Sequence, residues 1–251
     1  MNSLKFLTIL GLSSLTLTQG LPVWASSLVA LKFPNTGDRG APVTTTGGGT
    51  RSPGSCIAVG EQQQLSVNAL APNFSNTVTT VSRRPNLYFY IPPNTAQWGE
   101  IQITDEGENV VAQTQFTLPK TPGIIKVATQ PTQPLVADKY YQWSLTLVCN
   151  TKARDQDFSV SGTLEIKAPQ GKPPANATFL EQAEFYAQQG IWLDTLDNLI
   201  QLQSPSSQGV SPSSEWEELL QSAGLQDLSE KPLLDCCQTA QGVSHRSLPS
   251  P

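Results

Sequence analysis

Short runs of alternating apolar and polar residues recur between Cys56 and Lys167, and Pro, Gly and Asn separate them. This two-residue period is that of a half-buried β-strand, because successive side chains of a strand point to opposite faces of the sheet. No helical period lies between the runs, which favours antiparallel strands over a parallel sheet with crossover helices. The expected strands are Cys56–Val59, Leu65–Leu70, Asn86–Ile91, Glu100–Asp105, Val110–Leu118, Ile124–Thr129, Tyr140–Cys149 and Phe158–Lys167.

The last two of these runs alternate most clearly, and we expect them to form a central antiparallel pair. In the first, Trp143, Leu145 and Leu147 share one face with Tyr141 and Cys149. In the second, the apolar residues again occupy every other position. The fold class predicted from these patterns is mainly β, an antiparallel, immunoglobulin-like β-sandwich.

A Pro-rich stretch at 169–176 ends the alternation, and residues 177–228 then follow a helical period. Gly190 is expected to end a first helix as a left-handed cap, and a second helix follows it. The two are expected to form a C-terminal α-helical hairpin. A short third helix is expected to start at Ser214, within a capping box, and to stop at Gly224.

Three aromatic residues of this helical segment are candidates for a packing face or a partner-binding face: Tyr186, Trp192 and Trp216. In one interpretation these side chains are buried against an edge or face of the sheet. In the other they form a groove that binds a partner. The sequence leaves both open.

The N-terminus has the features of a cleavable signal peptide, residues 1–25. Lys5 precedes an apolar run of about twelve residues, and Val23 and Ala25 present a small-residue cleavage site before Ser26. The run is too short for a spanning helix, which needs about twenty apolar residues. We therefore expect cleavage between Ala25 and Ser26, and a periplasmic or extracellular protein with no membrane span in its mature chain.

The expected organisation of the mature chain begins with an extended Gly/Thr-rich arm at 26–55. A β-sandwich domain at 56–168 follows, then the Pro-rich linker, the helical segment packed on or beside the sandwich, and a flexible tail at 229–251. Arg39 and Arg51 are candidate anchors of the arm through hydrogen bonds. An anion-binding role for the Gly triplet at 47–49 is the alternative.

The charge is unevenly distributed along the chain. Residues 169–251 carry 3 Lys+Arg and 10 Asp+Glu, a net charge of −7, whereas residues 26–168 carry a net charge of +1. Nucleic acid and anionic lipid both require a basic surface, so neither is an expected partner. An unknown protein or envelope component is the expected partner.

The four cysteines divide into two sets. Cys56 and Cys149 are predicted to form a disulfide between the sheets, which an oxidising compartment permits. Cys236 and Cys237 are adjacent, and a bond between them requires a strained eight-membered ring. Reactive or intermolecular thiols and a pair without a particular role both remain open.

The inventory of chemical groups does not predict a catalytic, cofactor or metal site, and the chain is not expected to be an enzyme. Its single histidine, His245, lies in the expected tail, and no Cys-x-x-Cys spacing is present. Paired carboxylates occur at 105–106, 155 and 157, and 217–218. Any of these could act in glycoside hydrolysis, and the hairpin loop at 105–109 is a weak calcium candidate.

Several motifs in a fixed order resemble a known family. They are Arg39-Gly40-Ala41-Pro42, Gly47-Gly48-Gly49-Thr50-Arg51, Cys56, Phe116–Pro119, Thr121–Ile124, Tyr141-Gln142-Trp143, Cys149, Tyr186-Ala187 and Gly190–Asp194. The chain resembles the cyanobacterial family called domain of unknown function 928 from about Arg39 to about Leu225. This resemblance implies a cyanobacterial, exported protein, and it brings no activity, substrate or catalytic residue.

The function expected from the sequence is that of an exported, non-catalytic binding or structural module. An accessory component of surface assembly or secretion, docking through the acidic helical segment, is the alternative. A hydrolase of envelope polysaccharide is a third hypothesis.

Overall fold

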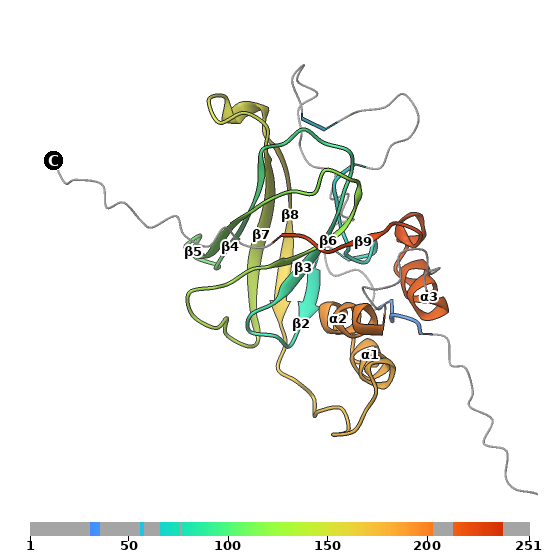
Figure 1. The fold of residues 1–251 in the computed structure, drawn as a ribbon. Helices are drawn as coiled ribbons and strands as arrows, with labels where there is room; N and C mark the ends of the chain where they lie inside the picture. The colour runs from blue at the N-terminus through green and yellow to red at the C-terminus, as the bar shows by residue number, and fades with distance from the viewer. Residues whose placement is uncertain (1–30, 36–55, 58–65, 76, 203–212, 238–251) are drawn as a thin grey trace, which may run out of the picture.

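Two β-sheets and three α-helices make up the described part of the chain (Figure 1). The computed structural model describes residues 31–35, 56–57, 66–75, 77–202 and 213–237. In spatial order, the five-stranded sheet consists of β2 (Thr77–Thr80), β8 (Phe158–Ile166), β7 (Lys139–Val148), β4 (Trp98–Thr104) and β5 (Val110–Phe116). The four-stranded sheet consists of β1 (Asn68–Ala69), β3 (Asn86–Ile91), β6 (Gly123–Ala128) and β9 (Leu233–Leu234).

Both sheets are mixed, which differs from the purely antiparallel arrangement expected from the sequence. The mainly β class is confirmed, but β2 pairs parallel with β8, and β9 pairs parallel with β6. Neither β2 nor β9 was predicted. Their lengths of 4 and 2 residues are too short to show a period of two, and each lies at the edge of its sheet.

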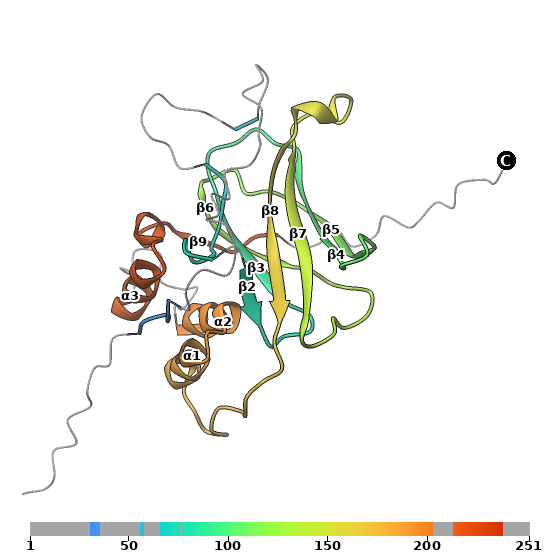
Figure 2. The same ribbon diagram turned by 180° about the vertical axis from the view of Figure 1, so that it is seen from behind.

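The predicted central pair is confirmed, and it is easiest to follow from behind (Figure 2). β7 pairs antiparallel with β8 over nine register positions, from Lys139 opposite Ile166 to Leu147 opposite Phe158. Trp143 lies directly opposite Gly162 in this register. Trp143, Leu145 and Leu147 are all buried, as the alternation of this run predicts.

Aromatic packing connects the two sheets. Phe89 of β3 meets Trp143 of β7 edge to face, with ring centroids 5.4 Å apart. Leu87 and Ile91, on the same face of β3 as Phe89, are also buried. The other face of β3 is thereby turned away from the five-stranded sheet, and it carries the site described below.

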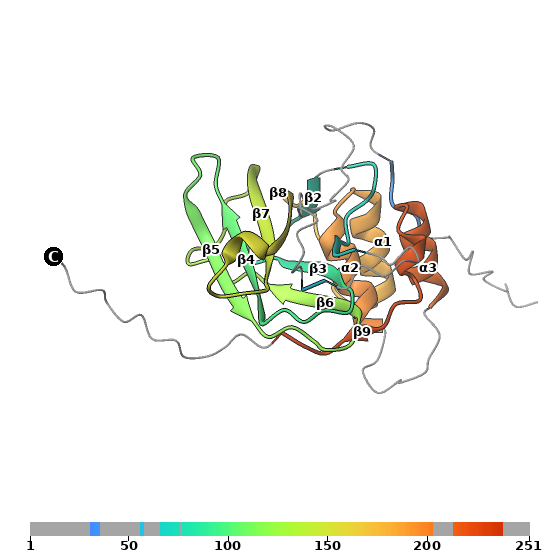
Figure 3. The same ribbon diagram turned by 90° about the horizontal axis from the view of Figure 1, so that it is seen from above.

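The helices are α1 (Phe179–Gln188), α2 (Trp192–Leu202) and α3 (Ser214–Ser222), and Figure 3 shows them together on the side of the molecule away from β5. Short 3-10 turns occur at Arg154–Gln156 and Gln226–Leu228. Gly190 has a φ of 64°, so α1 ends in the left-handed conformation that the sequence predicts. Gly224, with a φ of 72°, follows α3 in the same way.

α3 starts at Ser214 as expected, but the residue that caps it differs by one position from the expected capping box. Ser213, and not Ser214, is the N-cap, because its hydroxyl accepts a hydrogen bond from the backbone N–H of Trp216. The capping box of this region is at α1. Thr178 and Glu181 there exchange reciprocal hydrogen bonds at the helix start.

Three other expected segments also have different extents. Of the run Cys56–Val59, only Cys56 and Ile57 are described, and Ile57 forms an isolated bridge with Asn94. In the described part of the run Leu65–Leu70, residues 66–70, only Asn68–Ala69 is a strand. The segment expected as a flexible tail is described as far as Cys237 and contributes β9.

The expected signal peptide and arm, at 1–25 and 26–55, fall outside the described residues except for 31–35. Among the helices that are described, none is long and apolar enough to cross a membrane.

The close approach of Trp143 to Gly162 gives a test of the central pair. A Cβ added at Gly162 would lie 2.6 Å from Cζ2 of Trp143, which forces the buried indole to move. We expect Gly162→Ala to lower the free energy of unfolding by about 1–3 kcal/mol, as overpacking of a core does. Urea unfolding followed by tryptophan fluorescence measures the change. Ser161→Ala, on the exposed face of the same strand, is the matched control. Equal midpoints for the two variants would contradict the packing described.

Candidate functional site

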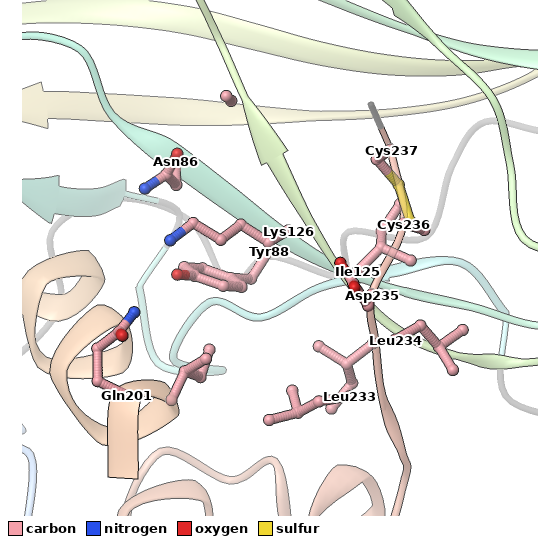
Figure 4. Close-up of a pocket in the computed structure, with 13 residues that line it drawn as sticks. Asn86, Tyr88, Ile125, Lys126, Gln201, Leu233, Leu234, Asp235, Cys236 and Cys237 are labelled. Atoms are coloured by element: carbon pink, nitrogen blue, oxygen red, sulfur yellow. A yellow bond between two sulfur atoms is a disulfide. The ribbon is translucent and has the colours of Figure 1, made fainter. Parts of the chain in front are cut away.

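A pocket of about 520 Å³ lies between α2, the outer face of the four-stranded sheet and the segment containing β9 (Figure 4). Its volume is within the range of sites that bind small molecules, roughly 300–1,000 Å³. We call it the α2–β9 pocket. It is lined by residues 86, 88, 124–126, 128, 200–201 and 233–237.

Alternation along β3 and β6 determines which side chains reach this pocket. Phe89 faces Trp143 between the sheets, so its neighbour Tyr88 points to the opposite face. Asn86 lies on the same face as Tyr88, and the register places Lys126 of β6 directly beside Tyr88. The sheet therefore presents an amide, a phenol and an ammonium group to one side of the pocket.

Asp197 of α2 accepts hydrogen bonds from all three of these groups. Its carboxylate lies 2.8 Å from Nζ of Lys126 and 3.3 Å from Nδ2 of Asn86, and the hydroxyl of Tyr88 donates to it as well. The Lys126 and Asp197 side chains are 40% and 29% exposed, so the ion pair itself contributes little stability. Tyr88 is buried, and its hydroxyl requires the partner that Asp197 supplies.

The environment of Tyr88 keeps its hydroxyl protonated. Burial raises the pKa of Tyr88 far above its usual value, and the adjacent negative charge of Asp197 and the hydrogen bond to it act in the same direction. The phenol is therefore a fixed hydrogen-bond donor and not a base. It orients Asp197, which in turn orients Lys126 at the polar end of the pocket.

The opposite end of the pocket is formed by the β9 segment and is mainly apolar, although Asp235 also lines it. Leu233 and Leu234 pair with Ile124 and Ile125, and the N–H of Ile124 donates to the carbonyl of Pro232 at 2.8 Å. Gly123 permits this close approach, because a Cβ at that position would lie 2.6 Å from Cγ of Leu234.

Cys236 and Cys237 form a disulfide with each other that lines the same end (Figure 4). The sequence left the role of these two residues open. Cys237 has a φ of 72°, a left-handed backbone conformation that is uncommon for residues other than glycine.

α2 is attached to the edge strand β2 through two threonines. Thr79 donates to the carbonyl of Gly190 at 2.7 Å and accepts from the N–H of Trp192 at 2.9 Å. Asp194, in the first turn of α2, accepts from the hydroxyl of Thr80 at 2.6 Å and the N–H of Val81 at 3.1 Å. These bonds fix the helix beside the sheet, and Asp197 follows Asp194 by one turn.

Burial is the largest influence on Asp194 and raises the pKa of its carboxyl above the usual value. The hydrogen bonds from Thr80 and Val81 oppose this effect, whereas the nearby charge of Asp197 adds to it. The ionised carboxylate is therefore held at this position at a cost to stability.

One carboxylate of each pair that the sequence offered for catalysis accepts a hydrogen bond from a backbone N–H group. Asp157 accepts from the N–H of Cys149 at 2.8 Å, and Glu218 accepts from the N–H of Leu31 at 3.0 Å. Asp105 accepts from the N–H groups of Gly107 and Asn109 within the β4–β5 hairpin. No group of three or more His, Cys, Asp or Glu residues that could hold a metal ion occurs in the described ranges.

The predicted disulfide between Cys56 and Cys149 is confirmed, with a Cα–Cα distance of 5.2 Å, and neither residue lines the α2–β9 pocket. Trp192 and Trp216 are both buried, and their indole N–H groups donate to the carbonyls of Leu70 and Ser229. The structure thus places both tryptophans in packing positions.

Tyr186, the third of the predicted aromatic residues, is only partly buried and packs edge to face with Phe185. The expected cleavage residues Ala25 and Ser26, the arm residues Arg39 and Arg51, and His245 all lie outside the described residues.

None of the polar residues of the pocket was predicted from the sequence. One signal was present, because Lys126 is the single charged residue in the apolar run Gly123–Ala128. A second was the spacing of Asp194 and Asp197, which puts two carboxylates on one side of a helix. Neither signal shows which strand or helix these side chains contact.

The comparisons with known proteins identify a family and nothing closer. The family model described as Domain of Unknown Function (DUF928) matches residues 46–233. No curated protein matches the chain. No solved structure matches it either.

The contact between Asp197 and Tyr88 gives a testable coupling. Asp197→Ala leaves the buried Tyr88 hydroxyl without its acceptor, and we expect a loss of about 1–3 kcal/mol in the free energy of unfolding. In a Tyr88→Phe background the same substitution is expected to cost clearly less, because the donor is already absent. Urea unfolding of the four proteins measures the difference. Equal costs in the two backgrounds would show that the residues are not coupled.

The raised pKa of Asp194 predicts that its contribution to the free energy of unfolding depends on pH. As pH rises above the usual carboxyl pKa of 3.8, the unfolded chain loses the proton of Asp194 before the folded protein does. The contribution of Asp194 to the free energy of unfolding is therefore smallest at pH values above its raised pKa. Asn at this position retains an oxygen acceptor for Thr80 and Val81 and does not ionise.

We expect Asp194→Asn to become progressively more stable relative to the parent protein as pH rises from about 4 to about 7. Denaturant unfolding of both proteins at several pH values measures this difference, in which other titrating groups cancel. A difference that is constant, or that changes in the opposite direction, would refute the assignment.

Proposed function

The chain belongs to the family described as Domain of Unknown Function (DUF928), and we propose that it is an exported, non-catalytic binding module whose ligand site is the α2–β9 pocket. The observation that carries this proposal is the pocket itself, with a volume of about 520 Å³ and two chemically different ends. A site of this size, with apolar walls and a few oriented polar groups, is typical of small-molecule recognition.

The lining of the pocket supports an amphipathic ligand. Leu233, Leu234 and the adjacent disulfide offer apolar surface for the body of a ligand. The ammonium group of Lys126 and the amides of Asn86 and Gln201 are available for hydrogen bonds to a polar head. Lys126 is held in place by Asp197, so the polar end is organised before a ligand arrives.

Export and the absence of catalysis are supported by different features. The N-terminal sequence has the pattern of a signal peptide, and the two disulfides suit an oxidising compartment such as the periplasm or the cell exterior. One carboxylate of each pair that could serve a polysaccharide hydrolase, Asp105, Asp157 or Glu218, is engaged with a backbone N–H group, which disfavours that hypothesis. We also propose that the fold is an immunoglobulin-like sandwich with a helical hairpin, since Phe89 and Trp143 pack between the sheets and α1 and α2 are consecutive.

A second candidate function is docking to another envelope protein during surface assembly or secretion. It is favoured by the acidic character of the helices, which carry Glu181, Glu184, Asp194, Asp197, Glu215, Glu217 and Glu218 without a lysine or arginine. A basic partner surface would complement this charge.

Titration with the fluorescent probe 1-anilinonaphthalene-8-sulfonate tests the pocket, because this amphipathic anion has an apolar ring system and a charged head. We expect one molecule to bind per chain. Ala128→Trp, at an exposed position that lines the pocket, is expected to weaken binding by about tenfold or more by filling the site.

Gln113→Trp, at an exposed position on β5, is the matched control and is expected to leave the affinity unchanged. Equal affinity in the two variants, or no binding to the parent protein, would overturn the pocket as the ligand site.

A further inference from the structure

The two disulfides of this protein constrain the chain in different ways. The bond between Cys56 and Cys149 joins residues 93 positions apart and so restricts the unfolded chain. The bond between Cys236 and Cys237 joins adjacent residues, closes no loop of chain and gives almost no stabilisation of that kind. Its effect is confined to the backbone of the two residues, at the apolar end of the α2–β9 pocket.

The disulfide ring constrains Cys237 in a conformation that a free cysteine seldom adopts. With a φ of 72°, Cys237 is in the left-handed region, where the side chain of an L-residue crowds its own backbone. Once the sulfur–sulfur bond is broken, this backbone is free to return to the common negative φ values. The position of Cys236 and Cys237 against the pocket therefore depends on the bond.

The segment that carries these residues is attached to the sheet by few interactions. β9 pairs with β6 at two register positions, whereas β3 pairs with β6 at six. Leu233 and Leu234 are only partly buried. Short elements with few buried contacts open locally at low free-energy cost, so β9 is the wall of the pocket that moves most easily.

A reductant in solution also reaches the two disulfides unequally. Cys236 and Cys237 are both partly buried, at the rim of an open pocket. In the other disulfide, Cys56 is 6% exposed and belongs to the buried core, whereas Cys149 is partly buried. Thiol–disulfide exchange requires access to a sulfur atom, and both cysteines of the adjacent pair but only one of the Cys56–Cys149 pair are partly exposed, so the adjacent pair is expected to react first.

We propose that the Cys236–Cys237 disulfide is a redox-responsive wall of the α2–β9 pocket, whose reduction releases β9 and weakens ligand binding. In the reaction, one thiolate of a dithiol attacks a sulfur of the pair, which forms a mixed disulfide and frees the other cysteine. The second thiol of the reductant then displaces the first cysteine. Overall the cysteine pair gains two electrons and two protons, and the dithiol is oxidised to a disulfide. The ligand part of this proposal rests on the proposed function.

The structural part is tested without a ligand. After mild treatment with dithiothreitol and alkylation, mass spectrometry is expected to find label on Cys236 and Cys237 while Cys56 and Cys149 stay bonded. Hydrogen exchange is expected to become at least severalfold faster in the peptide that contains Leu233 and Leu234, and to stay unchanged in β7. Unchanged exchange in the reduced protein would overturn the proposal.

A Cys236→Ser/Cys237→Ser double variant is expected to show the fast exchange of β9 with or without the reductant. Gly123→Ala opens the same segment by steric conflict with Leu234 and serves as the positive control for a displaced β9. Near-ultraviolet circular dichroism of the buried tryptophans verifies that each variant is folded. A double variant with slow exchange of β9 would show that the bond does not hold the segment.

The ligand part uses 1-anilinonaphthalene-8-sulfonate on the oxidised and the reduced protein. We expect the reduced protein and the double variant to bind the probe about tenfold more weakly, which corresponds to about 1.4 kcal/mol. Equal binding in both states would refute the redox response and leave the proposed site intact. No binding in the oxidised state would refute the site, while hydrogen exchange still decides whether the bond holds β9.

Discussion

The hydrogen bonds between strand β2 and the start of helix α2 determine where the candidate site can form. Thr79 and Thr80 bind Gly190, Trp192 and Asp194 across more than a hundred residues of sequence. They hold the start of α2 against this edge strand and fix the rotation of the helix about its axis. Because Asp197 follows Asp194 by three residues, the rotation that brings Asp194 to β2 also brings Asp197 over β3 and β6.

The same anchoring organises the segments around α2. Trp192 is buried where its indole N–H donates to Leu70 and its ring meets Phe33 at 4.9 Å. Residues near Phe33 lie along α3, since Leu31 and Phe33 donate to the side chains of Glu218 and Ser222. A carboxylate and a hydroxyl of the helix thus satisfy backbone groups of a segment distant in sequence. The acidic helical region is in part a scaffold for this packing.

The sequence predicts those features that depend on the burial of one face. The alternation in Tyr140–Cys149 identifies β7 and its buried residues, Asn86–Ile91 is β3 with the bounds expected, and the helical period and Gly190 locate α1 and α2. The pairing of Cys56 with Cys149 was predicted from the place of Cys149 at the end of the alternating run, directly after β7 in the structure. Periodicity shows which face of a strand or helix is buried, but it does not show which other element packs against that face. The contact of Lys126 with Asp197 spans 71 residues, and β2 and β9 are too short to show a period, so the pocket could not be derived from the sequence.

The side chains at the polar end of the pocket are held by more interactions than the β9 segment at the other end. This difference bears on how the proposed ligand would enter. At the polar end, Asp197 receives three hydrogen-bond donors and Tyr88 remains protonated because it is buried, so that end has one arrangement. At the apolar end, two residues of β9 and a bond between neighbouring cysteines hold the wall. An organised polar end can orient a head group without further loss of entropy. A loosely held, mainly apolar end can admit and enclose bodies of different size, so under the proposed function we expect selectivity for the head of a ligand and tolerance for its body.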